Sequence, residues 1–292
     1  GGQEARYTDE TPAGVARVKK HPALLEAIAR YIERQTEATG AALPAWLGDV
    51  WQKGAELALV VRCRELGRAL CDPEQFSAVP LAERTHAEST VRALERRAAD
   101  VVGDWQEILT DVELLRETFA GAGDTGVTDA DLVATVRRAS RAEGVDARGP
   151  ALPDGEAIVG KLDTEDDPLL LHLFQKKHGG LVRYEHIAID EAQDMSAVEL
   201  QVLLAAAAGD DPAARSVTVA GDRAQRMVFD NAFTDWAQFL RAAGHPAVEI
   251  NPLRISYRST ADVMRLARHV LGPLAVGDKE PAPLVARDGA PV

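Results

Sequence analysis

The stretch IAIDEAQD, residues 187–194, decides the fold class of the second half of the chain. Three apolar residues are followed directly by the acids Asp190 and Glu191. This pattern predicts a short buried strand whose carboxyl end carries carboxylates. In α/β folds that end of a strand is the edge at which ligands bind.

Strands and helices alternate on the carboxyl side of this stretch. SAVELQVLLAAAA, residues 196–208, predicts a helix in which Ser196 is the N-cap and Glu199 completes a capping box. SVTVA, residues 216–220, predicts a second strand that ends at Gly221-Asp222. A helix is expected over residues 233–243, and another follows residues 257–258. Such alternation indicates a parallel α/β layer.

The first half of the sequence predicts helices almost throughout. They are expected over residues 22–39, 44–70, 81–109 and 111–120, and from an N-cap at Thr128 to a stop at Gly144. The Pro- and Gly-rich residues 145–155 indicate a linker, and one more helix is expected over residues 167–177. We therefore divide the chain into a helical subdomain (1–155), an α/β part (156–272) and the start of a further domain or tail (273–292).

Composition is that of an ordinary globular protein, with 46% hydrophobic and 27% charged residues among 292. A formal net charge of −13 argues against an electrostatic clamp on duplex DNA. No apolar run approaches the roughly 20 residues that span a bilayer, and residues 1–10 show no leader pattern, so a cytoplasmic location is expected. Cys63 and Cys71 are expected to be reduced thiols, because no metal-ligand spacing surrounds them.

Asp190 and Glu191 have the chemistry that nucleotide hydrolysis needs. One carboxylate holds Mg²⁺, generally through water, and the other orients or deprotonates the attacking water. The alternative is an ordinary helix N-terminus, where the helix dipole favours acidic residues.

Two further motifs follow in the sequence. VAGDRAQ, residues 219–225, has a glycine that lets the backbone approach a ligand, and the Gln225 amide can hydrogen-bond both a γ-phosphate and water. In ISYRST, residues 255–260, Arg258 precedes a helix and can supply transition-state charge. The alternatives are a surface turn for the first motif and a surface ion pair for the second.

Together, the order and spacing of the three motifs over residues 166–271 resemble superfamily 1 helicases of the UvrD/Rep type. The resemblance implies an α/β fold: part of a RecA-like P-loop NTPase parallel sheet (domain 1A), with a large all-helical subdomain in the place of domain 1B. It implies ATP and Mg²⁺ as cofactors and single-stranded or duplex DNA as partner of the full-length protein. By the same resemblance Asp190 is the Mg²⁺ ligand and Glu191 the catalytic base, and Gln225 and Arg258 contact the γ-phosphate. Asp222 and Gln193 belong to the same motifs and are expected to contact the nucleotide.

Softer features resemble the HelD branch of this superfamily, which associates with bacterial RNA polymerase. They are DWQEILTDVELL (104–115), DDPLLLHLF (166–174) and YRSTADVMRLA (257–267). The alternative function is therefore a non-catalytic module that binds RNA polymerase. An unrelated acid-dependent hydrolase using Asp190 and Glu191 is a third possibility, for which the sequence offers no substrate pocket.

The sequence departs from the family pattern in motif I, the phosphate-binding loop GxxGxGK[ST]. GEAIVGKL, residues 155–162, has Leu162 where Ser or Thr would ligate Mg²⁺, and no apolar strand precedes it, so we interpret it as a loop. Motifs V and VI are also missing. We therefore expect a fragment of a larger motor that alone neither hydrolyses ATP nor unwinds duplexes. Phe229, Phe233 or Trp236 are candidates to stack on bases, with helical core as the alternative.

Overall fold

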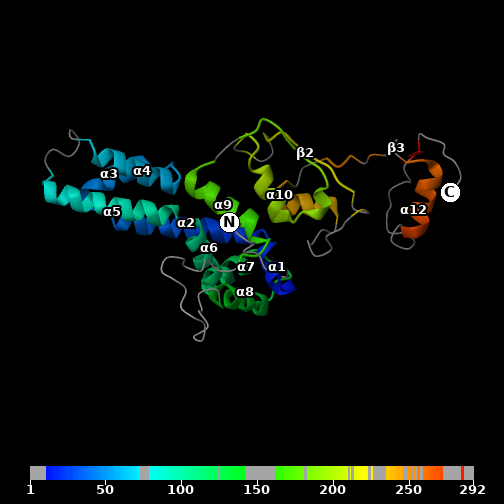
Figure 1. Cartoon of the computed structure of the whole chain (residues 1–292), viewed down its shortest axis with the longest axis horizontal. Helices are drawn as coiled ribbons and strands as arrows, with labels where there is room; N and C mark the ends of the chain where they lie inside the picture. Colours follow the sequence, from blue (N-terminus) through cyan, green and yellow to red (C-terminus); the bar gives the residue numbers. More distant parts are fainter. Residues whose placement is uncertain are drawn as a thin grey trace, which may run out of the picture.

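The structure, a computed structural model, is described for residues 11–72, 79–123, 125–141, 162–180, 183–209, 211, 214–222, 225, 235–245, 249–251, 253, 255–256, 259–271 and 284–285. In these ranges helices predominate, and the strands form two short parallel pairs. The fold is thus α/β in a coarse sense, with far more helix than sheet. Figure 1 shows the elements spread along one long axis.

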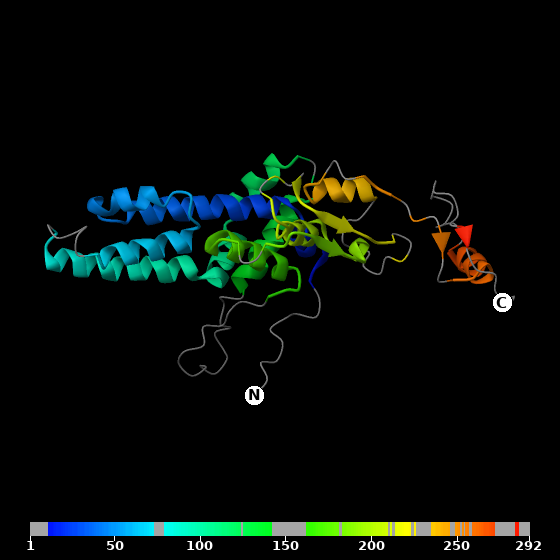
Figure 2. The same ribbon diagram turned by 90° about the horizontal axis from the view of Figure 1, so that it is seen from above.

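The chain up to Arg141 is helical in its described ranges. Its helices are α1 (Ala13–Lys19), α2 (Ala23–Ala41), α3 (Gly48–Lys53), α4 (Leu59–Leu70), α5 (Leu81–Ala99), α6 (Val101–Thr110), α7 (Val112–Gly121) and α8 (Asp129–Arg141). Helices α3, α4 and α5 share a small core around Trp51, Leu66 and Val91. Figures 1 and 2 show these helices projecting as an arm from the rest of the molecule.

The largest core lies where the helical half meets the second half. Trp105 of α6 is buried in it, and its indole N–H donates to the Asp166 carboxylate at 3.1 Å. Asp166 begins α9 (Asp166–His178), which packs against α2, α4, α5 and α6 on one side and α10 (Ala197–Leu204) on the other. We assigned this stretch to the α/β part, but α9 is packed into both halves and joins them.

A two-stranded parallel sheet organises the second half. Strand β1 (Ile187–Ile189) pairs with β2 (Val217–Val219), with Ile187 opposite Val217 and Ile189 opposite Val219. Ile189, Val217 and Val219 pack with α10 and α11 (Trp236–Ala242) into a third core. The intervening Ala188 and Thr218 are exposed, so the helices cover one face of the sheet and leave the other face open.

Toward the carboxyl end, a second parallel pair joins β3 (Ile255–Ser256) to β4 (Leu284–Val285), beside α12 (Ala261–Leu271). Figures 1 and 2 both show this unit at the far end of the long axis from the arm. Within the described ranges, no helix has the length and apolar character that crossing a membrane requires. Both cysteines are free thiols, as expected.

Side-chain capping accounts for the start of several helices. Ser196 and Glu199 form the predicted capping box of α10, and the Thr128 hydroxyl accepts from the Asp131 N–H at 3.3 Å as the N-cap of α8. The expected helices over 44–70 and 81–109 are each broken. The second breaks at Asp100, whose side chain accepts from the Gly103 N–H at 2.9 Å and so starts α6. Helix α11 begins at Trp236, capped by Asp235, and not at residue 233.

Candidate functional site

The candidate site lies where β1 and β2 end. The Ala220 N–H donates to the Ile189 carbonyl at 2.8 Å, and the Ala192 N–H donates to the Ala220 carbonyl at 3.0 Å. The pairing therefore continues one step past the strands. It brings Asp190 and Glu191, which follow β1, beside Asp222, which follows β2. All three residues are exposed.

Glu191 has an unusual backbone conformation. Its φ of 54° and ψ of 32° lie in the left-handed region, and it is the one non-glycine residue with a positive φ in the described part of the chain. The Asp190 carboxylate accepts the Glu191 N–H at 2.9 Å and holds this turn. A left-handed residue other than glycine costs roughly 1–2 kcal/mol, and such strain concentrates at functional positions. The turn directs the chain from the strand into η2 (Ala192–Asp194).

Gln193 ties the two strand ends together through its side-chain amide. Its nitrogen donates to the Glu191 carboxylate at 2.6 Å, and its oxygen accepts the Asp222 N–H at 2.9 Å. The side chain is fully buried. We expected Gln193 to contact the nucleotide. In the structure both ends of its amide hydrogen-bond protein groups, the Glu191 carboxylate and the Asp222 backbone.

The contact between Gln193 and Asp222 also requires a glycine at position 221. A Cβ at this position would lie 2.3 Å from the Gln193 side-chain oxygen and 2.8 Å from the Trp236 ring. Gln193 and Trp236 thus fill the space that a side chain at this position would need. The sequence shows the glycine after a predicted strand. It does not show that the Gln193 side chain lies beside this glycine, because that depends on the pairing of β1 with β2.

The Gln225 side chain hydrogen-bonds Asp222. Its amide donates to the Asp222 carboxylate at 2.7 Å, and both side chains are on the surface. Trp236 packs into the third core against Phe239, with ring centroids 6.1 Å apart, as the core interpretation predicts. Arg258, Phe229 and Phe233 lie outside the described residues, as do residues 155–161 of the GEAIVGKL stretch.

The exposed carboxylates fit what a nucleotide-bound Mg²⁺ requires. In the described part of the chain neither Asp190 nor Glu191 forms an ion pair, so no described lysine or arginine neutralises them. Mg²⁺ is typically held by one or two carboxylates with water and phosphate oxygens completing the shell. Asp190 is the residue that would hold it. No group of three or more His, Cys, Asp or Glu that could hold a metal by itself occurs among the described residues.

Comparisons with known protein families, with curated protein sequences and with solved structures found no match.

Proposed function

We propose that this chain contributes the acid-bearing half of an ATP-hydrolysing site to a cytoplasmic motor of the superfamily 1 helicase type, which acts on DNA. The observation that carries the proposal is the parallel pairing of β1 with β2, because it puts Asp190, Glu191 and Asp222 at one edge. In this proposal β1 and β2 are two strands of a RecA-like sheet. The uncovered face of the pair leaves room for the second layer of helices that such a sheet carries.

Each residue has a distinct task in the proposed site. Asp190 would hold Mg²⁺, and the bound ion would supply positive charge beside the transferred phosphoryl group. Glu191 orients and deprotonates the attacking water, and the Gln193 amide keeps its carboxylate in place. Gln225, held by Asp222, responds to the γ-phosphate, and Arg258 contacts the same group.

A phosphate-binding loop must be supplied from outside the motifs of this chain. Backbone N–H groups and a lysine of such a loop cradle the phosphates, and carboxylates alone repel them. We therefore predict that the isolated chain does not hydrolyse Mg-ATP. ATP turnover by the isolated chain that disappears in Glu191→Gln would contradict this part of the proposal.

The central test is ATP turnover by the complete gene product that contains this chain. Glu191→Gln is expected to lower turnover by roughly 10²–10⁴-fold, the usual contribution of a general base. Glu185→Gln is the matched control, because it removes an exposed carboxylate at the opposite end of β1. Equal turnover of the two variants, or a coding sequence without GxxGxGK[ST] upstream, rules the proposal out.

The alternative function, binding to RNA polymerase without catalysis, is favoured by one observation, the projecting arm of α3, α4 and α5 (Figure 2). A projecting helical arm can reach a partner that a compact domain cannot. Co-purification of RNA polymerase with the complete protein, lost when the arm is deleted and retained in Glu191→Gln, is the result that supports it. Loss of turnover in Glu191→Gln without any polymerase binding favours the motor.

A further inference from the structure

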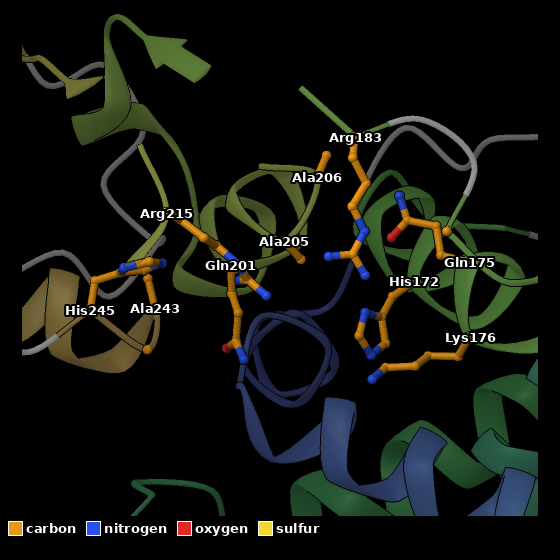
Figure 3. Close-up of a pocket in the computed structure, with 12 residues that line it drawn as sticks. His172, Gln175, Lys176, Arg183, Gln201, Ala205, Ala206, Arg215, Ala243 and His245 are labelled. Atoms are coloured by element: carbon orange, nitrogen blue, oxygen red, sulfur yellow. The ribbon is translucent and has the colours of Figure 1, made fainter. Parts of the chain in front are cut away.

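A cavity lies at the opposite edge of the sheet from the candidate site. Its volume is about 320 Å³, within the range of small-molecule sites. It is bounded by the carboxyl-terminal parts of α9, α10 and α11 and by the segments that lead into β1 and β2. Figure 3 shows Arg183 and Lys176 reaching toward His172, while Arg215 and Gln201 enter from the other side.

The ionisable side chains that line this cavity in the described part of the chain are all basic. Lys176, Arg183 and Arg215 carry formal positive charge, and His172 and His245 are the other titratable groups. Among the described residues no aspartate or glutamate lines the cavity, although the whole chain has a net charge of −13. Like charges gathered in a concave site raise the local potential and attract counter-ions. The cavity is therefore electrostatically prepared for an anion.

Basic side chains near the carboxyl end of a helix often hydrogen-bond its last carbonyl groups, but several donors in this cavity do not. Arg215 donates its Nε–H to the Gly209 carbonyl at 3.0 Å, while its two terminal nitrogens hydrogen-bond no described residue. Lys176 likewise forms no ion pair with a described residue. The His172 Nδ1 atom is buried without a hydrogen-bond partner in the described part of the chain. Donors remain available for a ligand inside the cavity.

We propose that this cavity binds an oligophosphate, either free pyrophosphate or the diphosphate tail of a nucleotide. Guanidinium groups present paired N–H donors that match phosphate oxygens, and lysine adds a point charge. The three basic side chains Lys176, Arg183 and Arg215 match the charge of an anion with three or more negative charges. A ligand with a single carboxylate would balance only part of their charge. The site is separate from Asp190 and Glu191, which lie at the other ends of the same strands, and the inference does not depend on the proposed function.

The test is calorimetric titration of the chain with inorganic pyrophosphate, without Mg²⁺ and in the presence of a chelator. One saturable site is expected. Lys176→Gln should weaken binding about tenfold, the value of one charge-assisted hydrogen bond. Lys176 is exposed, so this variant is expected to fold, which circular dichroism checks. Arg215→Lys keeps the charge but loses the paired donors, and should also weaken binding.

Two control variants separate the cavity from general electrostatics and from the candidate site. Arg241→Gln removes an exposed charge of α11 that does not line the cavity, and Glu191→Gln alters the other edge. Both should leave pyrophosphate affinity unchanged. Absence of saturable binding, or equal weakening by Lys176→Gln and Arg241→Gln, overturns the proposal.

Nucleotides and nucleic acid distinguish the sources of the phosphate. ADP that binds more tightly than pyrophosphate, with the same loss in Lys176→Gln, identifies a nucleotide tail as the ligand. Equal affinities identify the phosphates alone. A single-stranded oligonucleotide that binds through Lys176 while pyrophosphate does not overturns the small-ligand proposal in favour of nucleic acid.

Discussion

Among single residues, Gln193 has the most consequential contacts of the candidate site, because its amide reaches a backbone group 29 positions away in the sequence. Gln193→Ala leaves the Asp222 N–H without its acceptor and opens a small void under Glu191. We expect a loss of about 1–3 kcal/mol in the free energy of unfolding, the usual cost of an unsatisfied buried group, measured by urea denaturation. Gln225→Ala is the control: its amide is exposed, and a change within about 0.5 kcal/mol is expected. Equal losses in the two variants would show that the Gln193 contacts do not hold the strand ends.

The sequence pattern predicted where the acids of this site lie, at the end of a strand. It did not predict the contacts that Gln193 and Gly221 make beside them. The strand before Asp190 and the capping box after it follow from short-range rules, and the structure confirms both. The role of Gln193 and the crowding at Gly221 depend on which strand lies beside β1. A pairing between distant segments leaves no local pattern in either of them.

On the scale of elements, α9 joins the two halves and carries a half-buried histidine, His172, into the basic cavity. Burial, followed by the charge of Lys176, lowers the pKa of His172 to about 4. The other described ionisable groups that line the cavity are Arg183, Arg215 and His245, and none of them is an acid that would stabilise a protonated His172. His172 is therefore neutral in the folded protein at neutral pH.

This pKa predicts acid sensitivity. As the pH falls below about 6.5, His172 becomes protonated in the unfolded chain but stays neutral in the folded protein. The free energy of unfolding is therefore lost progressively between pH 6.5 and 4, by up to about 3 kcal/mol. Urea denaturation at pH 7.5 and pH 5 measures the loss, and His172→Gln should reduce it. His86→Gln, on the exposed side of α5, is the control. An unchanged pH dependence in His172→Gln would contradict the prediction.

On its other side α9 is fixed by an ion pair. The fully buried Lys177 pairs with Asp104 of α6, which is also fully buried. Asp104 further accepts from the Tyr31 hydroxyl at 2.8 Å and from the Gln35 amide at 3.1 Å, and it pairs with Arg97. One carboxylate thus connects α2, α5, α6 and α9.

Removal of the Asp104 carboxylate should leave the buried charge of Lys177 without its partner. Asp104→Ala is expected to cost about 3–5 kcal/mol in the free energy of unfolding, because Lys177 loses its partner. Asp104→Leu combined with Lys177→Met removes both charges and should recover most of the loss. Glu107→Ala is the control, since Glu107 contacts the same Tyr31 and Arg97 on the surface and its loss should cost less than about 1 kcal/mol. A double variant as unstable as Asp104→Ala would contradict this account.

For the whole molecule, composition and periodicity predicted a helical first half and an α/β second half, which the structure confirms in coarse form. They did not predict the break at Asp100, because apolar spacing continues across it and the cap competes with the helix only locally. Nor did they predict the basic cavity, since its Lys176, Arg183 and Arg215 come from three separate segments.

The spread of the elements along one axis, with the arm at one end and α12 at the other, has a hydrodynamic consequence (Figures 1 and 2). An elongated particle has a larger frictional coefficient than a sphere of the same mass, so it diffuses more slowly and elutes early from a gel-filtration column. Elution volume calibrated with globular standards therefore overstates the mass of this chain and imitates a dimer. Sedimentation equilibrium, which depends on mass and not on shape, is the appropriate measure of its oligomeric state.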